Sequence, residues 1–146
     1  MSIQVFVQNE AGSTRKNYHD EKTLAFQRSD VVPHPYPFPY GFVIGTKAGD
    51  GGNLDCYVIT ERRLETGQVV ECEPMGLMEQ FEDGVDDHNL LARLADEPVT
   101  LADEIEAALT NHVLTCFRDS DVRVSIGRFL GRDEALAHIA SHLEST

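Results

Sequence analysis

Cysteine is scarce in this chain. The three cysteines, Cys56, Cys72 and Cys116, lie far apart, and no Cys-x-x-Cys motif occurs. An odd number of scattered cysteines argues against a disulfide framework and against a structural zinc site. Because all three have apolar neighbours in the sequence, we expect them to be buried free thiols.

Basic residues are also few. Twelve lysines and arginines stand against 25 acidic residues, which leaves a formal net charge of −13. A surface of this sign repels nucleic acids and anionic membranes at long range, so neither is an expected partner. It also repels a free polyphosphate, so an acidic protein that binds phosphate groups needs bridging cations and a few well-placed Lys or Arg side chains. A solubilising surface or adaptation to salt is the simpler explanation of the charge.

Long hydrophobic runs are absent as well. No apolar run is long enough to span a membrane, and the first residues, Met1–Val5, lack the basic region and the apolar stretch of a signal peptide. These absences predict a soluble, cytoplasmic protein. The chain has 146 residues, of which 41% are hydrophobic, and this predicts a single domain over residues 1–146.

The pattern of apolar residues predicts many short strands and two helices. Strands are expected at 3–7, 24–28, 42–46, 54–60, 68–72, 75–81 and 122–126, with 128–130 extending the last. Residues 10–21 are expected to be an irregular polar connection, and 88–94 a strand or a helical turn. A capping box of Thr100 and Asp103 opens one helix, and a second runs from about Asp133 to Leu143. This order predicts an α+β domain, most simply a small barrel with two helices packed outside.

Four of the six prolines alternate with other residues in the segment Val31–Tyr40. Such alternation excludes a helix and a central strand, and it favours an extended, rigid segment. An exposed polyproline linker is the alternative. That alternative would leave the aromatic residues of the segment, Tyr36, Phe38 and Tyr40, without apolar contacts.

Two carboxylates, Asp50 and Asp55, lie on a glycine-rich loop that follows this segment and leads into a predicted strand. Carboxylates so placed are natural ligands for a hard divalent cation, and glycines let the loop fold tightly enough for both to converge. A second acidic loop could return to the same barrel mouth through a strand pair; it holds Glu82, Asp83, Asp86 and Asp87. Simple solvation of the acidic loops is the alternative.

The remaining polar candidates are ambiguous. His138 and His142 have a spacing that can bind a metal ion, but no acidic residue accompanies them, so we expect an exposed helix face. His88 adjoins the acidic loop and could pair with it. The scarce basic residues include Arg15, Lys16, Arg28 and Arg118, and each could be an ordinary surface charge.

Residues 36–55 resemble soluble family I inorganic pyrophosphatases, and the resemblance extends over roughly residues 3–143. The family shows Tyr-Pro-x-Asn-Tyr-Gly followed by Asp-x-Asp-Pro-x-Asp. Tyr36, Tyr40 and Gly41 occupy their places in the first motif, and Asp50 and Asp55 occupy the first and last carboxylates of the second. The resemblance implies a small closed five-stranded OB-like β-barrel with two flanking α-helices. It also implies a homo-oligomer, which is a hexamer in the bacterial members.

The function implied by the resemblance is hydrolysis of inorganic pyrophosphate, or of a related phosphoanhydride, by a water that Mg²⁺ activates, with Mn²⁺ as an alternative ion. The implied metal ligands are Asp50, Asp55, Glu82 and Asp87, and the choice between Asp86 and Asp87 stays open. The residues implied to bind the phosphate groups of the substrate are Lys16, Arg28, Tyr40 and Arg118. The implied catalytic residues are Asp50, Asp55 and Tyr40.

Several residues of the family are replaced in this chain. The middle Asp of the second motif, which activates the attacking water in the family, is Gly52. Loss of that carboxylate is expected to cost several orders of magnitude in rate, since the general base and the metal-bound water each contribute on the order of 10²-fold or more. Five further residues of the family are also replaced: a Pro by Asn53, a Glu by Gln8, a Lys by Asn89, a Tyr by Phe117 and an Asn by Pro39.

These replacements keep a second function open, that of a catalytically impaired relative that binds a phosphate compound or acts as an interaction subunit. A third alternative is an OB-type module for single-stranded nucleic acid. The net charge of −13 and the lack of a basic groove argue against it.

Overall fold

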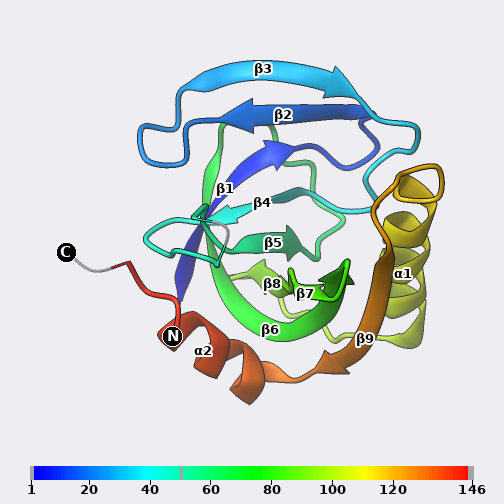
Figure 1. Cartoon of the computed structure of the whole chain (residues 1–146). Coiled ribbons are helices and arrows are strands. Elements are labelled where there is room, and N and C mark those ends of the chain that lie inside the picture. Colours follow the sequence, from blue (N-terminus) through cyan, green and yellow to red (C-terminus); the bar gives the residue numbers. More distant parts are fainter. Residues whose placement is uncertain (1, 50, 145–146) are drawn as a thin grey trace.

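Five strands close into a barrel in the computed structural model, which describes residues 2–49 and 51–144 (Figure 1). In order around the barrel they are β1 (Ile3–Asn9), β4 (Tyr40–Val43), β5 (Asp55–Val58), β8 (Asn89–Leu94) and β6 (Val69–Glu82). The pairing of β6 with β1 closes the ring. Only the β5–β8 pair is parallel among these five pairings. The expected closed five-stranded barrel with two outer helices is therefore confirmed.

The long strand β6 replaces the two strands that the sequence predicts at 68–72 and 75–81. Its register against β8 shifts between Pro74 and Gly76. A β-bulge of this kind bends a strand without ending it. The bend lets β6 pair with β1 and β8 and, further along, with β9 (Val124–Leu130) and the short β7 (Val85–Asp86). The two predicted strands were thus one strand interrupted by a local irregularity.

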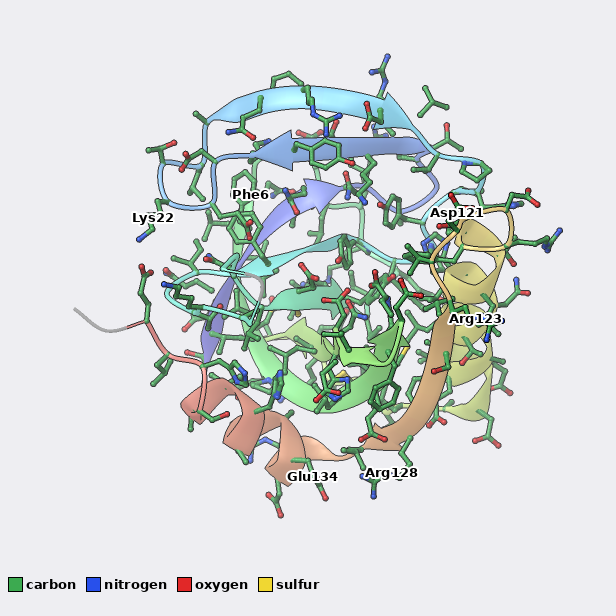
Figure 2. The ribbon with its side chains drawn as sticks, in the orientation of Figure 1. Phe6, Lys22, Asp121, Arg123, Arg128 and Glu134 are labelled. Carbon is green, nitrogen blue, oxygen red and sulfur yellow. The ribbon has the colours of Figure 1, made fainter. Side chains whose placement is uncertain are left out.

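A separate hairpin of β2 (Arg15–His19) and β3 (Phe26–Val31) covers one side of the barrel, at the top of Figure 1. The prediction of an irregular connection at 10–21 was wrong, because β2 is almost wholly polar and shows no apolar alternation. Phe6 of β1 joins the barrel to the hairpin: its ring lies 4.8 Å from that of His19, and Figure 2 shows it between the two layers.

The helices α1 (Asp103–Cys116) and α2 (Arg132–Ala140) pack outside the barrel, α1 beside β9 and α2 against β6 (Figure 1). The predicted capping box of Thr100 is wrong, since Ala102 is the N-cap and no side chain caps it. In place of a side-chain cap, acidic residues in the first turn of α1 interact favourably with the positive end of the helix dipole. No helix of the described residues has the length and apolarity that crossing a bilayer requires.

Two apolar clusters hold these layers together. The barrel interior forms the first cluster, which continues into the buried Ala135 and Ile139 of α2. The second lies between the barrel and α1, and its buried members include Met78, Leu91 and Leu109. All three cysteines are free; Cys56 and Cys72 are buried, as expected, and Cys116 is half-buried. The second cluster also holds aromatic residues that reach the candidate site.

Candidate active site

Polar residues reach one cavity from three strand segments, in pairs two positions apart. Alternate residues of a strand point to the same face, so each pair shares a direction. The pairs are Asp55 and Tyr57 from β5, Gln80 and Glu82 from β6, and Asp87 and Asn89 at the start of β8. All six line a cavity of about 610 Å³ between the barrel, the β2–β3 hairpin and α1. We call it the tyrosine cavity, after Tyr36, Tyr40 and Tyr57 in its wall.

The three tyrosines form a continuous aromatic wall. The Tyr40 ring centroid lies 5.6 Å from that of Tyr36 and 4.7 Å from that of Tyr57. His112 of α1 closes the wall, with its ring 5.0 Å from Tyr36. The proline-rich segment thus turns its aromatic side chains inward, as the sequence predicts, and Tyr36 is only 7% exposed.

Burial keeps these tyrosine hydroxyls protonated. It raises the pKa of Tyr36, Tyr40 and Tyr57, and the nearby carboxylate of Asp55 raises the pKa of all three further. Burial also lowers the pKa of His112. At neutral pH the wall therefore offers neutral hydroxyl donors, which suit an anionic ligand.

Glu82 and Asp87 form a close acidic pair in the same cavity. The hydrogen bond with Asp87, followed by burial and by the charge of Asp87, raises the pKa of Glu82 to about 7. Gln80 and Lys16 oppose this increase only in part. Two carboxyl groups this close disfavour the ionised form of one of them, and oxygen donors so placed suit a divalent ion.

The glycine-rich loop brings Asp55 to the mouth of the cavity. Asp55 opens β5 and lines the cavity, whereas Asp50 lies outside the described residues. The loop is closed by its own backbone, since the Ala48 N–H donates a 2.6 Å hydrogen bond to the Gly52 oxygen. Asn53 N–H donates a 2.9 Å bond to Glu21 of the neighbouring hairpin. These polar contacts tie Gly52 and Asn53 to their neighbours, but position 52 offers no side chain to the cavity.

The candidate cationic residues lie at different distances from this site. Lys16 of β2 lines the cavity. Arg28 stacks over the Tyr18 ring, 3.9 Å from its centroid, and pairs with Asp30 at 2.7 Å. Neither Arg28 nor the exposed Arg118 is among the residues that line the cavity, although Phe117, next to Arg118, is. Of these three basic residues only Lys16 is brought to the cavity wall.

Residues of the acidic loop line two neighbouring cavities. Asp87 lines both of them, whereas Asp86 lines only the neighbour of the tyrosine cavity. Asp83 turns away, and its side chain accepts a 2.9 Å hydrogen bond from the Arg123 N–H. Within residues 2–49 and 51–144, no group of three His, Cys, Asp or Glu side chains is placed to hold a metal ion.

The neighbouring cavity, of about 680 Å³, contains three histidines and is called the histidine cavity below. His88, His138 and His142 line it, together with Asp86. The expectation of an exposed helix face for His138 and His142 was wrong, because both are half-buried against the barrel. An acidic partner does exist, but the acidic loop supplies it from a distant part of the sequence.

Sequence reasoning did not single out Gln80, Tyr57 or His112 as site residues. Gln80 and Tyr57 lie two positions from Glu82 and Asp55, so strand alternation could have indicated them. His112 looks like part of an apolar helix face in the sequence. Only the packing of α1 against the tyrosine wall reveals its place.

Comparison with known proteins identifies the class. The family model described as inorganic pyrophosphatase matches residues 6–145. An inorganic pyrophosphatase from Haemophilus influenzae is 34% identical over 116 residues, which cover 69% of this chain and 66% of that protein. One from Buchnera aphidicola is 32% identical over 93 residues, which cover 62% of this chain and only 53% of that protein. The chain thus matches between about half and two thirds of the length of these curated relatives.

The fold agrees with this assignment. The crystal structure of an inorganic pyrophosphatase from Neisseria gonorrhoeae superimposes with a TM-score of 0.87 at 26% identity, covering 95% of this chain and 88% of that one. The chain belongs to the inorganic pyrophosphatase family, and its barrel has the OB-like architecture expected from the sequence.

Proposed function

We propose that this protein hydrolyses inorganic pyrophosphate, or a related phosphoanhydride, in the tyrosine cavity. The observation that carries the proposal is the convergence of Asp55, Glu82 and Asp87 on one cavity, with tyrosine hydroxyls and Lys16 in its walls. Acidic groups that share a cavity with neutral and cationic donors are what a phosphate substrate bridged by cations requires.

The acidic residues fit a hard divalent ion. All three are oxygen donors, and the neighbouring Asp87 raises the pKa of Glu82, as expected where acidic groups are crowded together. We assign Mg²⁺ as the ion, with Mn²⁺ as a substitute, and Asp50 as a further ligand. When bound, the ion neutralises phosphate oxygens and lowers the pKa of a bound water.

The chain's own residues then hold the substrate. The protonated tyrosines donate hydrogen bonds to phosphate oxygens, and Tyr40, in the centre of the aromatic wall, is the best placed to do so. Lys16 supplies a positive charge from β2. Arg28 and Arg118 contribute only if their side chains turn toward the cavity; for Arg28 the contact with Asp30 must then break.

Activation of the attacking water is the weak step. Position 52 has no carboxylate, so orientation of the water falls to the acidic residues that remain on the wall, Glu21, Asp55, Glu82 and Asp87. A slow enzyme follows, because a positioned base contributes on the order of 10²-fold or more. We further propose a cytoplasmic homo-oligomer, a hexamer by analogy with bacterial members of the family.

A non-catalytic phosphate-binding relative is the second candidate. The observation that favours it is the neutral character of Gln8, Asn89 and Gly52, the first two lining the cavity and the third in its loop. Such a protein binds a phosphate compound without cleaving it.

The two functions separate in one assay. We expect phosphate release from pyrophosphate that depends on Mg²⁺, stops with EDTA and falls at least tenfold in Asp55→Asn. Asp121→Asn is the matched control, because Asp121 is exposed and lines neither cavity. Release equal in the wild type and Asp55→Asn would instead support the non-catalytic relative.

A further inference from the structure

The histidine cavity gathers three imidazoles from two distant parts of the chain. His88 precedes β8, His138 lies on α2 and His142 follows it. The ring centroids of His138 and His142 are 4.4 Å apart, and those of His88 and His138 are 5.9 Å apart. Asp86 completes the group, with its Oδ2 atom 3.7 Å from Nε2 of His88.

Backbone contacts hold two of these rings by the same nitrogen. Nδ1 of His142 donates a 2.7 Å hydrogen bond to the His138 carbonyl oxygen. Nδ1 of His88 lies 3.2 Å from the Gln80 carbonyl oxygen and 3.0 Å from the Gln80 N–H, so the backbone accommodates either tautomer. A metal-bound imidazole typically donates its other N–H to a carbonyl group, which leaves Nε2 as the ligand. Nε2 of His88 lies beside the carboxylate of Asp86, and both residues line the cavity.

Two of the ring separations are near that of imidazole ligands around one ion. With metal–nitrogen bonds of about 2.0 Å, three imidazoles in a tetrahedral site have ring centroids roughly 5 Å apart. The two measured separations, 4.4 and 5.9 Å, lie on either side of this value. Within residues 2–49 and 51–144, no three such side chains are placed to hold one ion. Binding therefore requires the imidazole rings to rotate about their side-chain torsions. His138 and His142 are both half-exposed, and rotation of the His142 ring has to keep or break its 2.7 Å hydrogen bond to the His138 carbonyl oxygen.

We propose that His88, His138 and His142, with Asp86, bind one divalent transition-metal ion of the Zn²⁺ type. Imidazole suits Zn²⁺, Co²⁺ and Ni²⁺, whereas Mg²⁺ prefers oxygen ligands. The site therefore differs in chemistry from the acidic rim of the tyrosine cavity. The two are neighbours, because Asp55, Glu82 and Asp87 line both cavities. The proposal does not depend on hydrolysis of pyrophosphate.

Zinc binding to the full chain in a large excess of Mg²⁺ tests the site. Calorimetric titration of Zn²⁺ is expected to give one ion per chain, and Co²⁺ in the same protein is expected to give the visible absorption of a tetrahedral nitrogen-rich site. His138→Ala and His142→Ala are each expected to weaken Zn²⁺ binding at least tenfold. His34→Ala is the matched control, since His34 lines neither cavity, and it is expected to change nothing.

Asp55→Asn separates the histidine site from the carboxylates. Zinc binding retained in Asp55→Asn and weakened in both histidine variants supports the proposal. Zinc binding that is lost in Asp55→Asn but kept in His138→Ala and His142→Ala overturns it, and so does the absence of binding in excess Mg²⁺. Circular dichroism of each variant establishes that a lost signal does not come from unfolding.

Discussion

The side-chain amide of Asn89 donates a 2.7 Å hydrogen bond to the amide oxygen of Gln80, and both residues are almost fully buried. Gln80 in turn donates a 2.9 Å bond to a carboxylate oxygen of Glu82. The wall of the tyrosine cavity between β6 and β8 is therefore neutral where the family resemblance implies a lysine. These two bonds fix the orientation of the Gln80 amide.

Replacing Gln80 by Leu removes the acceptor for Asn89 in a buried place. We expect the free energy of unfolding to fall by about 1–3 kcal/mol, the usual cost of a buried polar group left unpaired. The double variant Gln80→Leu/Asn89→Leu should recover part of this loss, because both polar partners are then gone. Urea denaturation of the single and double variants measures the coupling. Strictly additive losses would show that the two amides do not depend on each other.

The raised pKa of Glu82 predicts pH-dependent binding of Mg²⁺. With its pKa raised to about 7, Glu82 is mostly protonated at pH 6 and mostly ionised at pH 8. A bound ion requires the ionised form, so affinity for Mg²⁺ should rise about tenfold between these pH values. Calorimetric titration of the metal-free protein measures it. Glu82→Gln should flatten the dependence, and an equally steep dependence in that variant would assign the proton elsewhere.

The histidine cluster predicts a loss of stability in acid. Burial, and then the neighbouring His142 and His88, lower the pKa of His138 from 6.5 to about 4. The unfolded chain therefore binds more protons than the folded chain between these two pH values, and the stability present above pH 6.5 is lost as the pH falls toward 4. Since His138 is half-exposed, we expect an effect of about 1 kcal/mol.

Urea denaturation in EDTA at pH 5 and pH 7 measures this effect. His138→Gln should reduce the difference between the two pH values, while His34→Gln should leave it as in the wild type. If His138→Gln lost as much stability in acid as the wild type, the cluster would not be its source.

Gly41 marks a close approach of two strands. A Cβ atom at this position would lie 1.7 Å from the carbonyl oxygen of Phe6 on β1. Gly41→Ala is therefore expected to cost about 3 kcal/mol or more, because backbone rather than a flexible side chain must move. At Gly49 an added Cβ meets open space, so Gly49→Ala is the control. A thermal melt in which Gly41→Ala matches Gly49→Ala would contradict this view of the barrel.

The barrel could be predicted because apolar residues recur along most of its strands and because a known motif spans residues 36–55. The hairpin could be predicted only in part, since the strand expected at 24–28 overlaps β3 but no pattern indicated β2. Its first strand is polar, and its attachment depends on the contact of Phe6 with His19, which no local pattern reveals. The bent strand β6 was predicted as two, since Pro74 interrupts the apolar pattern without ending the pairing.

The candidate site, too, could be predicted from the sequence only in part. Strand alternation carries Asp55, Glu82 and Asp87 to one wall, so the acidic rim follows from residues near each motif. The histidine cavity combines His88 with a helix some fifty residues later in the sequence, and only the packing of α2 against β6 joins them. Contacts between distant segments, rather than residue types, are what the sequence leaves undetermined.

The most direct test concerns position 52. Among the described residues of this loop, the positive φ of 90° is that of Gly51 and not of Gly52, so a side chain at position 52 needs no left-handed backbone. We would measure kcat for pyrophosphate with Mg²⁺ in the wild type, in Gly52→Asp and in Gly52→Asn, which matches the aspartate in size. If the cavity is a pyrophosphatase site that lacks its water-activating carboxylate, Gly52→Asp should be about 10²-fold faster than the other two. Equal rates in all three proteins would contradict the account.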